Sequence, residues 1–162
     1  MLNSFNVPTH YIESDLENTT MTVLPAEKFG FGLEVICRVK AAGSFLRRYG
    51  EYIKEGSFLN YLVEFTLKND EKADPFITKD TLTCLGILRG YEYDEFKILT
   101  KKITYIIKND LHKKGLDLYD IKLEFGKSKG KIILIDEIST GCMKVFKDGQ
   151  LLPPMELNKY IN

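Results

Sequence analysis

The sequence lacks both a long apolar run and an excess of charge of one sign. Its 162 residues include 23 Lys and Arg against 23 Asp and Glu, so the formal net charge is zero. Long-range attraction to nucleic acid or to an anionic membrane is therefore not expected. No stretch reaches the roughly 18 apolar residues of a membrane-spanning helix, and the first residues, Met-Leu-Asn-Ser-Phe-Asn, lack the regions of a signal peptide. We predict a cytoplasmic protein that binds neither membrane nor nucleic acid.

Cysteine and phosphate-loop motifs are also scarce. Cys37, Cys84 and Cys142 are odd in number, widely spaced and free of any CxxC pattern. This spacing favours free thiols over disulfides or a zinc site. The sequence contains no glycine-rich phosphate loop of the GxxxxGK[ST] type, and its one GKxK stretch is residues 126–129. We therefore expect no self-contained glycine-rich loop for the phosphates of ATP.

The residues that are present predict a folded domain. With 44% hydrophobic residues, the chain can bury a core of its own, and we predict one domain over residues 1–162. We expect strands at 9–13, 20–24, 33–39 and 61–67, and helices at 78–88 and 94–114. The longer helix is the most regular, because its apolar residues recur every three or four positions. Strands, helices and strands in succession predict an α+β fold, with a mostly antiparallel sheet flanked by helices.

A hairpin over residues 120–126 and 132–137 is the most informative segment. Apolar and charged residues alternate in its first strand, and the second is nearly all apolar but ends in two carboxylates. If even positions pair with even positions, one face holds Asp120, Lys122, Glu124 and Asp136. Carboxylates at strand ends beside a lysine can hold a divalent cation and its phosphates. The alternative is an ordinary hairpin with one solvent-exposed face.

A second candidate site follows the strand at 33–39. Gly43 permits close approach of the backbone, and Ser44 can cap a short helix that runs through Tyr49. A phosphate at this helix start would meet backbone N–H groups, the serine hydroxyl and Arg38. The alternative is an ordinary helix cap beside a surface arginine.

Motifs along nearly the whole chain resemble those of the SAICAR synthetase family. Residues 122–126, Lys-Leu-Glu-Phe-Gly, and 135–139, Ile-Asp-Glu-Ile-Ser, resemble the KLEFG…DE-[IF]-S signature. Residues 7–13 resemble the IPTHFIE strand, and residues 34–44 resemble the EVVVRNxAAGS segment. Residues 64–75 resemble the EFxxKNDxxxDP segment. The order of these blocks makes the resemblance specific.

The family consists of purine-pathway ligases that join aspartate to carboxyaminoimidazole ribonucleotide with ATP. The resemblance implies that Arg38 and Ser44 lie at the ribonucleotide phosphate and that Glu124 and Asp136 bind a metal near ATP. It also implies a catalytic role for Lys122, which would steady the developing charge. The full set of ligand-binding residues implied is Arg38, Ser44, Lys68, Asp70, Asp74 and Lys144.

The sequence also departs from the family pattern. It begins just before the IPTHFIE-like strand, so we expect a truncated form that lacks the ATP-binding N-terminal lobe and the C-terminal helix. Where the family reads SPDxxRxW, Gly141 replaces the aspartate and Lys144 replaces the arginine. Lysine keeps the charge but loses the planar fork that grips phosphate in a bidentate manner. Strands deprived of a lobe would expose edges and apolar surface, so we predict a homo-oligomer.

Three functions are compatible with this pattern. The favoured interpretation is a non-catalytic protein that sequesters or senses a phosphorylated ribose or nucleotide-like small molecule, needs no cofactor and is not an enzyme as a stand-alone chain. The alternative is an ATP-dependent ligase that uses ATP and Mg²⁺, with the missing lobe supplied by another subunit. A structural protein that keeps only the fold is the third. Binding is favoured because the ATP-cradling lobe, one acidic residue and the arginine fork are all missing.

Overall fold

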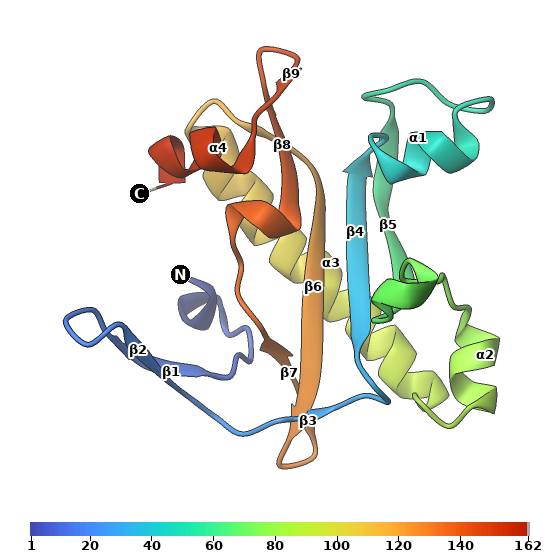
Figure 1. Cartoon of the computed structure of the whole chain (residues 1–162), viewed down its shortest axis with the longest axis vertical. Helices are drawn as coiled ribbons and strands as arrows, with labels where there is room; N and C mark the ends of the chain where they lie inside the picture. The colour runs from blue at the N-terminus through green and yellow to red at the C-terminus, as the bar shows by residue number, and fades with distance from the viewer. Residues whose placement is uncertain (162) are drawn as a thin grey trace. The chain divides into compact units, whose positions relative to one another are not determined.

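The computed structural model describes residues 1–161, whose elements are traced in Figure 1. The strands are β1 (Tyr11–Asp15), β2 (Thr20–Val23), β3 (Glu27–Lys28), β4 (Leu33–Lys40), β5 (Phe58–Leu67), β6 (Asp117–Ser128), β7 (Lys131–Ile135), β8 (Met143–Lys147) and β9 (Gln150–Leu151). The helices are α1 (Ser44–Tyr49), α2 (Lys79–Cys84), α3 (Gly90–Lys113) and α4 (Pro154–Ile161). Short 3₁₀ helices are η1 (Leu2–Phe5), η2 (Asp70–Lys72) and η3 (Thr140–Cys142). Within the described part of the chain, no helix has the length and apolar character that crossing a bilayer requires.

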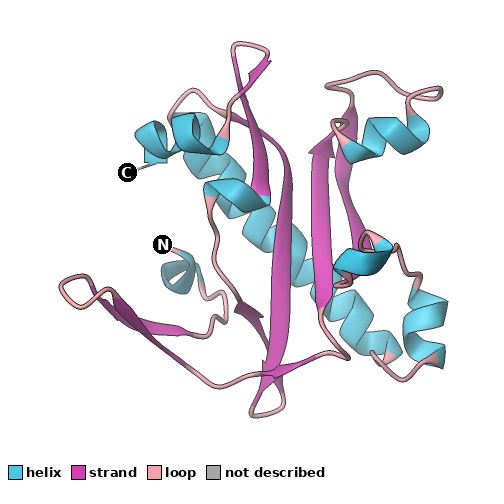
Figure 2. Cartoon of the chain, in the orientation of Figure 1, coloured by secondary structure: helices cyan, strands magenta, loops and turns pink. Residues whose placement is uncertain are grey.

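The strands form two sheets (Figure 2). β1 and β2 make an antiparallel hairpin of their own. The other seven follow the order β5-β4-β6-β8-β9, and β3 and β7 also pair with β6. The pairs that β6 makes with β3, β7 and β8 are antiparallel. The predicted α+β fold with a mostly antiparallel sheet is confirmed.

The described chain divides into two compact units. Unit 1 comprises residues 1–34, 65–99 and 123–137, and unit 2 comprises residues 35–64, 100–122 and 138–162. The core of unit 1 gathers around Phe96, whose ring centroid lies 5.0 Å from that of Phe29 and 5.0 Å from that of Phe125. Edge-to-face aromatic packing of this kind stabilises a core beyond the area it buries. One domain over residues 1–162 stays a prediction.

Unit 2 has its own aromatic centre. Tyr119 stacks on Phe146 with ring centroids 3.8 Å apart, and Ala42 packs beside them. Phe146 lies on β8, which continues through β9 into α4. No element was predicted after the hairpin, yet residues 154–161 form a helix. Pro154 suits the first position of that helix, because its missing N–H would have no partner there.

The hairpin differs from its predicted register. Glu124 pairs with Ile135, and Gly126 pairs with Ile133, so even positions face odd ones. The condition under which Asp120, Lys122, Glu124 and Asp136 would share one face is therefore not met. Asp136 has φ 65, a left-handed conformation that ends the strand at Ile135. Gly126 is constrained by space, because a Cβ there would lie 2.9 Å from the Cβ of Ala26.

The helices also begin or end at residues other than those predicted. α2 covers six residues and is shorter than predicted, although Thr78 caps it as the sequence suggests. α3 begins at Gly90, four residues before the predicted start. Glu92 explains this early start, because its carboxylate accepts the backbone N–H of Arg89 at 2.8 Å and is itself buried. An acidic side chain in the first turn also suits the helix dipole.

Candidate functional site

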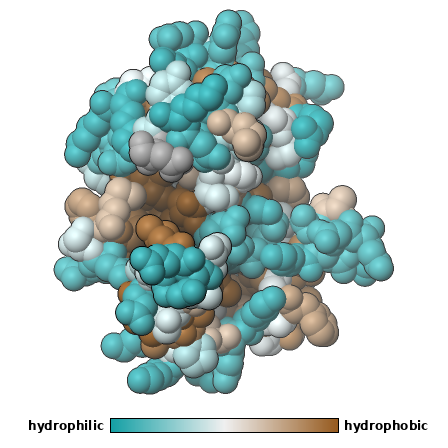
Figure 3. Space-filling view, turned by 60° about the vertical axis from the view of Figure 1, so that its left-hand side comes forward, coloured by the Kyte–Doolittle hydropathy of each residue, from teal (hydrophilic) through white to brown (hydrophobic). Residues whose placement is uncertain are grey.

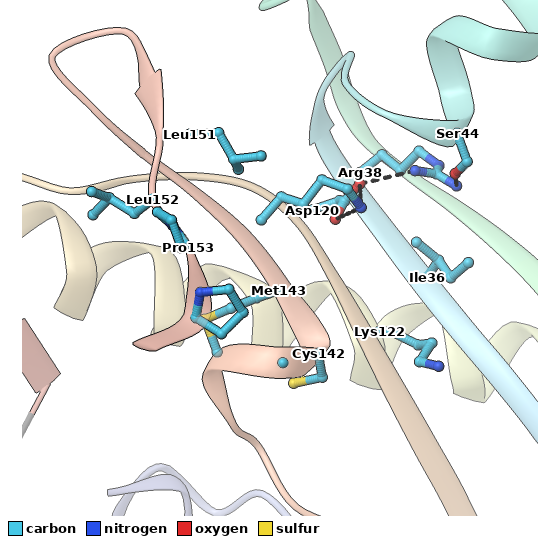
Figure 4. A pocket seen from close by; sticks show the side chains of 13 residues that line it. Ile36, Arg38, Ser44, Asp120, Lys122, Cys142, Met143, Leu151, Leu152 and Pro153 are labelled. Carbon is cyan, nitrogen blue, oxygen red and sulfur yellow. Dashed lines mark hydrogen bonds and ion pairs between the residues drawn. The ribbon is translucent and has the colours of Figure 1, made fainter. Parts of the chain in front are cut away.

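Unit 2 contains a cavity of about 530 Å³ (Figure 4). Its lining comprises Ile36, Arg38, Ser44, Asp120, Lys122, Gly141, Cys142, Met143, Lys144, Leu151, Leu152, Pro153 and Pro154. The charged side chains of the lining are three basic ones and one acidic one, Asp120. A surplus of positive charge in a recess with apolar walls favours an anionic ligand.

Arg38 is the most buried charged side chain of the cavity, with 1% of its side chain exposed. Its Nε donates to Glu64, its Nη1 donates to Asp120 at 2.9 Å, and its Nη2 donates to the hydroxyl of Ser44 at 3.2 Å. The alternative of a surface arginine is wrong, because this guanidinium is enclosed by acceptors. The ion pairs compensate for the cost of removing its charge from water.

The hydroxyl of Ser44 forms a hydrogen bond with Arg38 and does not cap α1. The residue that caps α1 is Gly43, and no side chain makes a capping hydrogen bond there. Ser44 is the first residue of the helix, and its hydroxyl accepts the Nη2–H of Arg38. The helix ends at Tyr49, as predicted, whereas the prediction that Ser44 caps it is wrong.

Lys144 approaches the same carboxylate from β8. Strand pairing places it opposite Asp120 on β6, and its Nζ lies 3.1 and 3.2 Å from the two carboxylate oxygens. The lysine stem passes directly over Gly43, where an added Cβ would lie 2.8 Å from Cε of Lys144. Gly43 also has φ 53 and ψ −121, a combination that side chains disfavour. The backbone conformation therefore favours glycine here, whereas the flexible end of Lys144 could shift to make room for a side chain.

Lys122 completes the basic lining. It lies two residues beyond Asp120 on β6, so the two side chains leave the same face of the strand. Its side chain is exposed at the cavity, whereas Asp120 is buried (Figure 4). The predicted catalytic lysine thus lies where a ligand in the cavity can reach it.

The other predicted residues lie in unit 1. Lys68 donates to Glu124 at 2.5 Å. This hydrogen bond raises the pKa of Lys68 above its ordinary value of 10.5, and the negative charges of Glu124, Asp136 and Glu34 act in the same direction. Glu124 is buried, whereas 43% of the lysine side chain is exposed. Lys68 and its carboxylates therefore form a second, more open charged cluster.

The donors of this cluster suit a magnesium ion that arrives with phosphates. Among residues 1–161, no three His, Cys, Asp or Glu side chains converge in a way that could hold a metal by themselves. Mg²⁺ is usually bound by one or two carboxylates, with substrate phosphates and water as the remaining ligands. Glu124 and Asp136, which both act on the Lys68 ammonium, fit that pattern. Their assignment to metal stays a prediction.

Asp74 organises a loop of unit 1. Its carboxylate accepts the backbone N–H of Asn69 at 2.8 Å, and the side chain of Asn69 accepts the N–H of Lys72 at 3.0 Å. Asp70, the first residue of η2, is exposed. The predicted residues therefore fall into two groups. Arg38, Ser44, Lys122 and Lys144 belong to unit 2, and Lys68, Asp70, Asp74, Glu124 and Asp136 belong to unit 1.

Sequence reasoning missed part of the cavity. Asp120 was placed on the charged face of the hairpin but was not assigned to the site, although it binds two of the predicted cations. Asp120 and Lys122 alternate with apolar residues along the strand, and this pattern could have assigned Asp120 to the same site as Lys122. The apolar wall of Met143 and residues 151–154 had no comparable signal, because it comes from a tail without periodicity.

Comparison with known proteins gives consistent matches. The sequence profile of the family described as SAICAR synthetase matches residues 1–156. A phosphoribosylaminoimidazole-succinocarboxamide synthase of Clostridium tetani is 57% identical over 162 residues, which cover 99% of this chain and 71% of that protein. The synthase of Thermotoga maritima is 39% identical over 152 residues, which cover 93% of this chain and 64% of that protein.

Solved structures agree with the sequence matches. The crystal structure of SAICAR synthetase from Pyrococcus horikoshii OT3 superposes with a TM-score of 0.85 at 31% identity, covering 99% of this chain and 70% of that one. A SAICAR synthetase in complex with ADP gives a TM-score of 0.81 at 34% identity, covering 97% of this chain and 66% of that one.

These matches contradict the prediction of a non-catalytic binder that sequesters or senses a small molecule. The match to the C. tetani synthase is 57% identical and covers 99% of this chain. That prediction gave too much weight to Lys144, since the lysine still makes an ion pair inside the cavity.

Proposed function

This chain belongs to the SAICAR synthetase family, and we propose that it takes part in the ligase reaction of that family. The reaction joins aspartate to carboxyaminoimidazole ribonucleotide with ATP. The identity of 57% over 162 residues with the C. tetani synthase is the observation that carries the proposal. The chain spans 71% of that relative and 64% of the T. maritima one, so the whole reaction is proposed rather than assigned.

The phosphate group of the ribonucleotide is proposed to bind at Arg38, Ser44 and Lys144, which we call the phosphate end of the site. The guanidinium of Arg38 carries more N–H groups than the three acceptors around it use. The side chain of Lys144 is more than one third exposed, and its ammonium carries three N–H donors. Charge-assisted hydrogen bonds from such groups are the strong ones for a phosphate dianion.

Lys122 is the proposed group for the chemical step. In the ligation, an oxygen of the ribonucleotide carboxylate takes the γ-phosphoryl group of ATP, and the aspartate amine then displaces phosphate from the carbonyl carbon. Negative charge develops on the carbonyl oxygen as the C–N bond forms, and the amine gives up a proton. An ammonium held beside that oxygen stabilises the developing charge, which is the largest kind of contribution in such reactions.

Glu124 and Asp136 are the proposed carboxylates for Mg²⁺, with Lys68 beside them. When bound, the ion would neutralise charge on the phosphate oxygens of ATP. Lys68 holds Glu124 in place by a hydrogen bond of 2.5 Å, and its own charge also favours phosphate. A relative supports the binding of an adenine nucleotide, because one solved SAICAR synthetase is a complex with ADP.

A direct assay tests the proposal. The purified chain is supplied with ATP, Mg²⁺, aspartate and carboxyaminoimidazole ribonucleotide, and the amide product and ADP are quantified. A second arm adds the part of the C. tetani synthase that lies outside the match, because the match covers 71% of that protein. Equimolar amide and ADP in either arm supports the proposal, and Lys122→Met should abolish both. Absence of amide in both arms contradicts it.

The predicted homo-oligomer also stays a prediction, and the N-terminal hairpin supports it. Every residue of β1 and β2 is exposed, including the apolar side chains of Ile12 and Met21. Figure 3 shows hydrophobic residues uncovered on the face that it displays. Sedimentation velocity measures the oligomeric state of the wild type and of an Ile12→Ser, Met21→Ser variant. A monodisperse wild-type monomer contradicts the prediction.

A further inference from the structure

Five side chains in unit 2 form an unbroken series of alternating charge. The series runs from Arg48 on α1 through Glu64 on β5, Arg38 on β4 and Asp120 on β6 to Lys144 on β8. Glu64 accepts from Arg48 at 2.6 Å through one oxygen and from Nε of Arg38 through the other. Each charge in the interior of the series is thus bound by two opposite charges.

The middle of the series is withdrawn from water and its ends are not. Exposed fractions of the side chains are 1% for Arg38 and 13% for Glu64, against 25% for Arg48 and 37% for Lys144. A buried ion is costly unless its partners satisfy it in a fixed geometry. Three positive and two negative groups leave a surplus of one positive charge, so the pairing does not cancel the attraction for an anion.

Glu64, like Arg48, does not line the cavity, but unlike Arg48 it binds Arg38 directly. It binds the Nε edge of the Arg38 guanidinium, while Asp120 binds Nη1. A planar group held by two carboxylates at different nitrogens cannot rotate about its long axis. Its Nη2 is then fixed beside the hydroxyl of Ser44, which lines the cavity (Figure 4).

We propose that Glu64 is a positioning residue for the phosphate end of the site and that it acts through Arg38. The proposal rests on the phosphate-binding part of the proposed function. Glu64 touches no ligand. It fixes the orientation in which Arg38 and Ser44 present their donors, so that a phosphate does not have to order the guanidinium on arrival. Preorganisation of this kind strengthens binding by lowering its entropic cost.

The sign of the effect separates positioning from simple electrostatics. Glu64 is a negative charge next to an anion site, so a purely Coulombic role predicts that removing it strengthens phosphate binding. A positioning role predicts weaker binding, because Arg38 loses the partner that fixes it. Glu64→Gln removes the charge and keeps the size. Glu64→Asp keeps the charge and withdraws the carboxylate by one methylene.

The experiment is isothermal titration calorimetry with ribose 5-phosphate as the probe. We expect Glu64→Gln and Glu64→Asp each to weaken binding by roughly tenfold, the lower end of the range for residues that orient a binding group. The matched control is Asp117→Asn, which removes another carboxylate of unit 2, bound to Lys40 and outside the cavity lining. This control should bind the probe as the wild type does. Thermal unfolding without ligand establishes that each variant is folded.

The outcomes distinguish this proposal from the ligase proposal. Tighter or unchanged binding by both Glu64 variants overturns the positioning role even if the ligase assay succeeds. Weaker binding by Glu64→Asp alone, should Glu64→Gln fail to fold, supports positioning, because the charge is retained. Probe binding with the expected losses, together with a failed ligase assay, rejects the ligase and keeps the positioning role. A wild type that does not bind ribose 5-phosphate overturns the positioning role as well.

Discussion

The two charged clusters of the molecule are built on different cations and buried to different depths. In unit 2, Arg38 is almost fully buried and is shared by Glu64 and Asp120. In unit 1, Lys68 meets Glu124 at 2.5 Å with 43% of its side chain in solvent. A planar guanidinium that stays charged suits a fixed framework, whereas a lysine on a flexible stem can give way to another cation. The difference is consistent with the proposed phosphate end of the site in unit 2 and with the proposed Mg²⁺ carboxylates in unit 1.

Removing Arg38 should give the largest effect. Arg38→Met leaves buried Asp120 with Lys144 alone and half-buried Glu64 with Arg48 alone, and we expect a loss of about 3 kcal/mol in the free energy of unfolding. Ribose 5-phosphate binding should disappear with it. Urea unfolding measures the first quantity and calorimetry the second. A loss below about 1 kcal/mol would place this network with ordinary surface ion pairs.

Gly43 should rank second because of its backbone conformation. Gly43→Ala introduces a Cβ at φ 53 and ψ −121, so we expect a loss of about 2–3 kcal/mol in the free energy of unfolding. The Cε of Lys144, 2.8 Å from the added Cβ, is near the end of a flexible side chain and can shift at little cost. Gly86→Ala is the comparison: φ is also positive there, 67, nothing lies within 4 Å of its added Cβ, and we expect about 1–2 kcal/mol. Urea unfolding measures both losses, and a larger loss for Gly86→Ala would contradict the ranking.

Lys68 should give a small effect on stability. Lys68→Met removes a partly exposed pair, so we expect a change below about 1 kcal/mol at neutral pH. Because the folded pKa lies above the ordinary 10.5, this contribution is complete below pH 10.5 and is lost as the pH rises through the folded pKa. Unfolding curves of variant and wild type should therefore converge at strongly alkaline pH. A difference that grows with pH contradicts the ion pair.

The thiols should report on both units without perturbing them. Cys84 of unit 1 is exposed, Cys142 lines the cavity of unit 2, and Cys37 is buried with its pKa raised to about 11 by loss of solvent. With an aromatic disulfide reagent at pH 8, Cys84 should react first, Cys142 more slowly and Cys37 only after unfolding. Ribose 5-phosphate should slow Cys142 and leave Cys84 unchanged. Equal slowing of both thiols would contradict binding in the cavity.

The fold could be predicted from local pattern, whereas the site could be predicted only in part. Alternation and helical periodicity are properties of neighbouring residues, and they placed β4 and α3 within a few positions. The register of β6 against β7 depends on the turn, so parity could not be read from the strands. The partners of Arg38 are 26 and 82 residues away in sequence, at Glu64 and Asp120. No spacing rule connects positions so distant, and the family resemblance identified Arg38 without showing what holds it.

Gly126, the last letter of the Lys-Leu-Glu-Phe-Gly motif, has a consequence for interpreting such motifs. Its added Cβ would lie 2.9 Å from Ala26, 3.1 Å from the carbonyl oxygen of Glu27 and 3.2 Å from Ile135, which are all parts of the fold itself. The glycine therefore permits the close approach of residues 26 and 27 and of Ile135 to β6. The motif thus combines two separate requirements: Glu124 supplies a charge that pairs with Lys68, whereas Gly126 leaves room for its neighbours by having no side chain. A chain that kept this fold without the reaction would still need the glycine.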